Sequence, residues 1–159
     1  MPIRLYRVDD RLIHGQVVVG WGSRLDARRY LVVDDDLATA EWEQELYALS
    51  VPEDATVEFR SVEEARKRLP AWREASEASI LLARSVETML RLARGGLLRG
   101  ERVNLGGIHH ETGRTKTLSY LYLDEADRKR LRRLEDEGAT VEARDLPGSA
   151  PVDLDRLLS

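Results

Sequence analysis

Hydrophobic and polar positions follow a strand pattern in short segments, which are separated by stretches with helical periodicity. Strand patterns, either alternating or fully apolar, occupy residues 2–8, 30–33, 56–59, 79–83, 102–105 and 140–143, and residues 117–123 also alternate. Helical patterns cover residues 17–21, 39–50, 62–72, 86–93, 124–137 and 152–158. Strands that alternate with helices in this way predict an α/β fold. We expect an open, mostly parallel central sheet of about six or seven strands with helices on both faces.

Two of the helical segments carry local boundary signals. Ser61 followed three residues later by Glu64 is a capping-box pattern, which predicts a helix start at residue 62. Asp124 can cap the helix of residues 124–137, and Gly138 is expected to end it.

Composition narrows the class of protein. The chain has 159 residues, of which 42% are hydrophobic, and no repeat or long linker, so we expect one domain over residues 1–159. It has no cysteine, which excludes disulfides, thiolate metal sites and cysteine nucleophiles. A net charge of −4 argues against nucleic-acid binding as the main function. There is no apolar run of roughly 20 residues and no signal-peptide pattern, so we expect a cytoplasmic protein.

Three unusual segments follow predicted strands. They are residues 7–16, the aspartates at 34–36, and the glycine- and histidine-containing residues 104–114. Together they hold all three histidines of the chain. Open α/β sheets bind ligands beyond the carboxyl ends of their strands, so these segments are where the chemistry is expected.

His14 stands just before an apolar helix, and a helix start attracts anions through its unpaired N–H groups and its dipole. Gly15 allows an anion to approach the backbone closely, and the guanidinium of Arg11 suits phosphate oxygens. A carboxylate of Asp9 or Asp10 could fix the tautomer of the ring, or could instead brace Arg11. The pattern favours a phosphoryl group held on a histidine nucleophile.

Structural interpretations compete with each of these functional ones. A histidine beside a helix start also serves as a hydrogen-bonding residue of the helix end. The aspartates at 34–36 are typical of a solvated strand exit or a helix cap. Two adjacent histidines, His109 and His110, cannot readily bind one metal together, and Gly106 and Gly107 lack the spacing of a nucleotide-binding loop.

Residues 7–17, Arg-Val-Asp-Asp-Arg-Leu-Ile-His-Gly-Gln-Val, are followed by Trp21. This run closely resembles the active-site segment of the IIB components of the mannose/fructose/sorbose family. That family belongs to the bacterial phosphoenolpyruvate-dependent sugar phosphotransferase system. Residues 32–35, residues 104–114 and the region from Asp127 to Pro147 also resemble segments of these proteins. The resemblance therefore covers essentially the whole chain.

The resemblance implies a cytoplasmic phosphocarrier with an α/β sheet and no metal or other cofactor. His14 would accept a phosphoryl group on Nδ1 from a phosphorylated IIA partner. It would pass the group to a sugar brought by the IIC and IID permease components, which would hold the protein at the inner face of the membrane. Arg11 would clamp the phosphate, and Asp9 and Asp10 match the acidic pair of the motif. Supporting roles are expected for Gly15, Gln16, Asp34, Asp35, Gly106, Gly107 and His109.

Two other functions remain open at this stage. A protein with the same fold could act as a regulatory phosphoprotein without a permease, since a phosphate can reset a docking surface. A metal-dependent phosphohydrolase could use Asp9, Asp10 and Asp34 as magnesium ligands. The sequence also departs from its relatives at His110, at residues 53–55 and in its high arginine content, and it does not identify the sugar.

Overall fold

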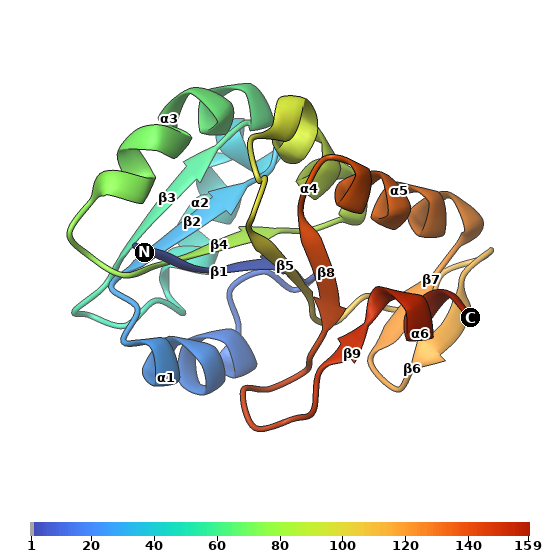
Figure 1. The fold of residues 1–159 in the computed structure, drawn as a ribbon. Helices are drawn as coiled ribbons and strands as arrows, with labels where there is room; N and C mark the ends of the chain where they lie inside the picture. Colours follow the sequence, from blue (N-terminus) through green and yellow to red (C-terminus); the bar gives the residue numbers. More distant parts are fainter. Residues whose placement is uncertain (1) are drawn as a thin grey trace.

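The computed structural model describes residues 2–159, which form a sheet covered by helices (Figure 1). The strands are β1 (Ile3–Val8), β2 (Arg29–Val33), β3 (Thr56–Arg60), β4 (Ser79–Ala83), β5 (Arg102–Leu105), β6 (Thr115–Leu118), β7 (Leu121–Leu123), β8 (Thr140–Ala143) and β9 (Val152–Asp153). The α-helices are α1 (Ser23–Leu25), α2 (Glu41–Ala48), α3 (Val62–Glu74), α4 (Val86–Ala93), α5 (Glu125–Asp136) and α6 (Leu154–Leu158). A π-helix, η1 (Gln16–Gly22), and two 3₁₀ turns, η2 (Leu37–Thr39) and η3 (Arg94–Gly96), complete the set.

Seven strands form the central sheet in the order β3-β2-β4-β1-β5-β8-β9. All neighbours are parallel except β8 and β9, which pair antiparallel. The predicted fold class is thus confirmed. The chain leaves β1 toward β2, returns to pair β4 with β1, and then places β5 on the other side of β1. The carboxyl end of β1 is therefore the topological switch point, where such sheets bind ligands.

Two apolar clusters lie on the two faces of the sheet. One joins the sheet to buried residues of α3, α4, α5 and α6. The other joins it to η1 and η2, with Leu12, Val17 and Trp21 among its buried members. Strand β4 is buried throughout, which explains why its sequence is a continuous apolar run. Helices on both faces were expected, and the two clusters confirm them.

Most predicted elements occur near their predicted bounds, and α3 begins with the expected capping box of Ser61 and Glu64. Three segments differ. The alternating residues 117–123 belong to a separate two-stranded sheet of β6 and β7, because the chain turns at Ser119 and Tyr120. The predicted helix of residues 39–50 begins as the turn η2, and the predicted helix of residues 152–158 begins as strand β9. None of the helices in residues 2–159 is long and apolar enough to cross a membrane.

Candidate functional site

The loops after β1, β4 and β5 are joined by backbone hydrogen bonds at one edge of the sheet. The Asp9 N–H donates to Ala83 at the end of β4, over 3.0 Å. Gly106 donates to Val8 over 2.7 Å, and Asp10 donates to Gly107 over 2.9 Å. The loops that carry the sequence motifs are therefore held side by side by the strands that precede them.

The carboxylate of Asp9 is completely buried and is the centre of the site. It accepts hydrogen bonds from Arg7, from both the backbone and the side chain of Arg11, from Nε2 of His14 and from the backbone of Gly107, at 3.1–3.3 Å. Burial alone would raise the pKa of Asp9. The hydrogen bonds from His14 and Arg11 and the charge of Arg7 outweigh burial and hold the pKa well below its usual range. Asp9 is thus a fixed negative charge between two arginines and an imidazole.

The ring of His14 is oriented by this carboxylate. Its Nε2 lies 3.2 Å from Oδ2 of Asp9, and 17% of the side chain is exposed. A carboxylate only accepts hydrogen bonds, so it places the ring proton on Nε2 and leaves the lone pair on Nδ1. Within residues 2–159, Nδ1 has no hydrogen-bond partner. Of the two aspartates that the sequence offered for the ring, the structure selects Asp9.

The helix η1 begins directly after His14. The backbone carbonyl of His14 accepts from Val17 over 3.0 Å and from Val18 over 2.9 Å, so Gly15 and Gln16 lie in the first turn of the helix. Around Gly15 there is open space, because a Cβ built there would meet nothing within 4 Å. The first turn therefore offers backbone N–H groups to an anion beside the ring.

Arg11 lies between the buried carboxylate and solvent. Its Nε and Nη2 donate to Asp9, Nη2 also donates to Oε1 of Gln16 over 3.0 Å, and 35% of the side chain is exposed. It also lines a small hollow of about 160 Å³ with Gln16, His109 and Tyr122. The guanidinium is therefore oriented from inside and can be reached from outside, as a phosphate clamp requires.

Backbone strain occurs between Asp9 and His14. Leu12 has a φ of +56° although it is not a glycine, and its side chain is fully buried in the cluster that contains η1. An L-residue in this region costs roughly 1–2 kcal/mol, so the packing of the side chain has to hold the turn in place. This tight turn brings His14 back toward the carboxylate of Asp9.

Arg7 is a site residue that sequence reasoning missed. Arg7 lies near the end of β1, and its side chain is completely buried. Its guanidinium donates to Asp9, to Oδ1 of Asn104 over 2.5 Å, and to the backbone carbonyls of Arg144 and Asp145. Burial lowers its pKa, which the charge of Asp9 opposes. The hydrogen bonds of the Arg7 guanidinium therefore connect the end of β1 to β5 and to the loop after β8. The sequence places Arg7 at the start of the motif of residues 7–17, but no local pattern there predicts that its side chain is buried.

The glycine pair after β5 makes room for both arginines. A Cβ at Gly106 would collide with the guanidinium of Arg7, and a Cβ at Gly107 would lie 2.9 Å from Nη2 of Arg11. These residues support the site through clearance, since neither has a positive φ. The sequence drew attention to the pair without revealing this reason.

Asp10 and His109 form a second pair on the rim of the site. Nδ1 of His109 lies 2.8 Å from Oδ1 of Asp10, and the backbone N–H of His109 donates to Oδ2 over 2.8 Å. The His109 side chain is 68% exposed. This pair joins the loop after β1 to the loop after β5, and it is separate from the contacts of His14.

Asp34 and Asp35, which follow β2, lie outside the group of residues around His14. Asp34 accepts from the backbone of Leu37 over 2.9 Å, so it caps η2. Asp35 accepts from the backbone of Val62 and from Arg91, and these contacts lower its pKa. Strand β4 separates β2 from β1, which places these side chains two strands away from the end of β1. Asp34 and Asp35 thus accept backbone N–H groups at the starts of η2 and α3, and neither joins the contacts of His14.

The geometry also bears on the magnesium hypothesis. Within residues 2–159, histidine, aspartate and glutamate side chains nowhere gather in threes as candidate metal ligands. Asp9 already accepts from two arginines, and Asp34 caps η2. The structure therefore does not support a metal site built from Asp9, Asp10 and Asp34.

Comparison with known proteins gives the class that this fold and site define. The chain matches the family model of the PTS system sorbose subfamily IIB component over residues 3–159. It belongs to this family, whose members are IIB components of the sugar phosphotransferase system.

Individual relatives carry different sugar names. The chain is 31% identical over 158 residues to the fructose-specific EIIB component of Bacillus subtilis (strain 168), covering 99% of this chain and 96% of that protein. It is 31% identical to the mannose-specific EIIAB component of Escherichia coli (strain K12), covering 91% of this chain and 44% of that protein. The IIBSor domain of the sorbose permease from Klebsiella pneumoniae has a similar structure, with a TM-score of 0.87, 28% identity and coverage of 99% and 96%. The resemblance in the sequence is confirmed, and the sugar varies among relatives.

Proposed function

We propose that the protein is a phosphocarrier that accepts a phosphoryl group on Nδ1 of His14 and passes it to a sugar. The observation that carries the proposal is the contact between Nε2 of His14 and the buried carboxylate of Asp9. It leaves Nδ1 as the one nucleophilic ring nitrogen, on a partly exposed side chain at a helix start. A His14 ring buried in the core would be out of reach of a phosphorylated partner and could not have this function.

The transfer is a displacement at phosphorus. The Nδ1 lone pair of His14 forms the new P–N bond, and the P–N bond of the partner's phosphohistidine breaks, returning its electron pair to the partner's ring. The His14 ring gains positive character while its Nε2–H stays hydrogen-bonded to Asp9, which stabilises that charge. Both species are phosphohistidines, so the step is close to reversible, and the protein contributes positioning and charge neutralisation.

Charge neutralisation would come from Arg11 and from the first turn of η1. The outer guanidinium edge of Arg11 and the N–H groups after Gly15 offer donors to the equatorial oxygens of the phosphoryl group. These donors make a metal unnecessary for the transfer between proteins. We expect the same rate when isolated phosphorylated IIA and the chain are mixed in the presence of EDTA.

The partners follow from the family. We infer that a phosphorylated IIA protein or domain is the donor, since a relative of this chain is named an EIIAB component. IIC and IID membrane components would bring the sugar, which would place the protein at the cytoplasmic face of the membrane. The alternative is a regulatory phosphoprotein of the same fold, which would take up phosphate without passing it to a sugar.

The test is incubation with phosphorylated IIA, followed by mass spectrometry of the intact chain. The wild type should gain one acid-labile phosphate and His14→Ala none. His110→Ala is the matched control, because it removes an exposed histidine that packs against Tyr122 and is not among the hydrogen-bond partners of Asp9. Uptake by His14→Ala at the wild-type rate would refute the proposal. Transfer onward to a sugar by membranes that hold the permease separates transport from regulation.

A further inference from the structure

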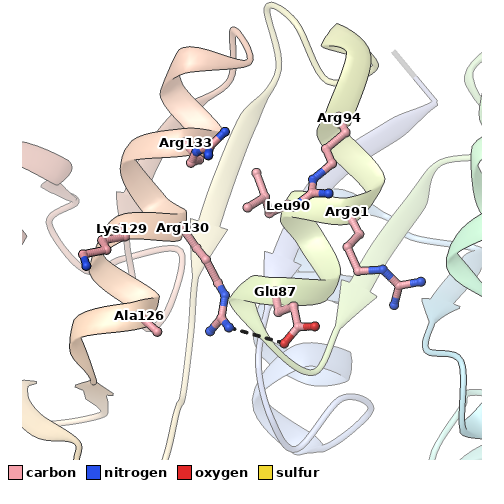
Figure 2. Close-up of a pocket in the computed structure, with 8 residues that line it drawn as sticks. All are labelled: Glu87, Leu90, Arg91, Arg94, Ala126, Lys129, Arg130 and Arg133. Atoms are coloured by element: carbon pink, nitrogen blue, oxygen red, sulfur yellow. Dashed lines mark ion pairs between the residues drawn. The ribbon is translucent and has the colours of Figure 1, made fainter.

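The helices α4 and α5 form a basic groove on the face of the sheet opposite η1. It has a volume of about 470 Å³, which is in the range of small-molecule sites. Its lining consists of Glu87, Leu90, Arg91, Arg94, Ala126, Lys129, Arg130 and Arg133 (Figure 2). The lining thus includes five cationic residues and one carboxylate, in a chain whose net charge is −4. The positive charge is local and is not a property of the whole surface.

Three carboxylates beside the groove pair with two of its cations. Glu87 and Asp127 both pair with Arg130, at 3.5 and 3.2 Å. Asp35 pairs with Arg91 at 2.8 Å. These pairs use two of the five cations, and the other three form no ion pair with a carboxylate of the described residues.

Those three cations are Arg94, Lys129 and Arg133. Within the described part of the chain, none of them forms an ion pair or a side-chain hydrogen bond. Arg94 comes from the α4 side of the groove and Arg133 from α5, with Leu90 between the helices (Figure 2). Like charges repel each other, and an anion bound between these cations would attract each of them and offset the repulsion. Guanidinium groups on two walls can hold a phosphate by paired hydrogen bonds.

The ends of the groove limit its occupant. Glu87 stands at one end, and Asp136 and Glu137 line an adjoining hollow that shares Arg94 and Arg133 with the groove. A basic stripe for a nucleic acid would have to continue past these carboxylates. The positive region is therefore short, which favours a small ligand over a polymer.

We propose that the groove between α4 and α5 binds a small phosphate-bearing molecule, with Arg94 and Arg133 as the two arms of a clamp and Lys129 as a third cation. Leu90 and Ala126 give the ligand an apolar floor. This site lies on the other face of the sheet from η1 and is independent of phosphoryl transfer through His14.

The test is a titration of the ¹⁵N-labelled chain with pyrophosphate, followed by NMR at constant ionic strength. Amide signals of Leu90–Arg94 and Lys129–Arg133 should shift with one binding curve, and they should shift equally in His14→Ala. The variant R94Q/R133Q should bind about tenfold more weakly or worse, since two charge-assisted contacts are lost. The spectrum of each variant also shows whether it is folded.

The matched control is R24Q/R132Q, which makes the same change in net charge at exposed arginines outside the groove. It should bind within about twofold of the wild type, because it leaves the clamp intact. Equal weakening in both double variants would overturn the proposal, as would shifts confined to Gly15 and Gln16. Binding to vesicles that contain phosphatidic acid, without binding of pyrophosphate, would also overturn it in favour of a membrane surface.

Discussion

Two acidic strand exits stand at the same edge of the sheet and have different roles. Asp9 follows β1 and accepts from two arginines and an imidazole. Asp34 follows β2 and accepts from the backbone of Leu37. Both carboxylates are buried or nearly so. The number of aspartates in the two loops therefore does not distinguish them, whereas the groups that each carboxylate contacts do.

The difference lies in which elements surround each exit. Strand β1 is central, so its exit meets the loops after β4, β5 and β8, which bring charged and polar groups from distant parts of the sequence. The exit of β2 leads directly into η2, where the N–H group of Leu37 donates to the carboxylate of Asp34. We therefore expect Asp9 to be needed for its charge and Asp34 to be needed only as an acceptor. Substitution by asparagine, which keeps an acceptor and removes the charge, should separate the two.

Asp9→Asn should have the largest effect on phosphoryl transfer. An amide in this position can donate to Nε2, which would move the ring proton to Nδ1 and remove the nucleophile. We expect the rate of phosphate uptake from phosphorylated IIA to fall by about 10²–10⁴-fold. Rapid-quench measurement of uptake checks this, and circular dichroism shows whether the variant is folded. A folded variant with a rate within twofold of the wild type would show that Asp9 does not set the tautomer.

Gly106→Ala should destabilise the fold, because the new Cβ collides with the buried guanidinium of Arg7. Overpacking of this kind costs about 1–3 kcal/mol, and the displaced arginine should also slow transfer by loosening Asp9. Gly148→Ala is the matched control, since its Cβ would meet nothing within 4 Å. The control should stay within about 0.5 kcal/mol of the wild type in urea unfolding. Equal stability of the two variants would mean that Arg7 does not need the clearance.

The acid dependence of stability should report Asp9 directly. Its pKa is lowered in the folded protein, so its stabilising contribution is complete above the unfolded pKa of about 3.9 and is lost as the pH falls toward the folded value. The stability advantage of the wild type over Asp9→Asn should therefore shrink below pH ~4, by up to about 1.4 kcal/mol per pH unit. Other carboxylates titrate in both proteins and cancel in the difference. Urea unfolding from pH 6 to pH 3 measures it, and a constant difference would contradict the charged network.

The sequence predicted those features of the fold and the site that depend on local pattern. The strands follow from short apolar and alternating runs, and His14 and Arg11 stand out because a helix start, a glycine and an arginine occur within a few residues. The sequence could not show whether Asp9 or Asp10 contacts the ring of His14, because this depends on the turn at Leu12. Leu12 has a positive φ, and no glycine at this position predicts such a turn.

The remaining contacts are long-range and leave no local signal. The distant hydrogen-bond partners of Arg7 are Asn104, Arg144 and Asp145, which follow it in the sequence by 97 to 138 residues. They cover its side chain only after the strands have assembled. The carboxylate of Asp35, for which the resemblance implies a supporting role, accepts from the backbone N–H of Val62 at the start of α3, 27 residues away. Only the order of strands in the sheet determines these partners, and that order is not encoded in any single segment.

Asp34→Ala should have a small effect on stability and none on transfer. Loss of a side-chain acceptor at the start of a short helix costs about 1 kcal/mol, and Asp34→Asn should recover most of it because asparagine is an equally good cap. Urea unfolding and phosphate uptake should be measured on both variants beside Asp9→Asn. Rescue by the amide at position 34 together with failure of the amide at position 9 is the expected outcome. Slower transfer by Asp34→Asn would instead mean that the charge after β2 reaches the phosphoryl group, and the two exits would then act as one site.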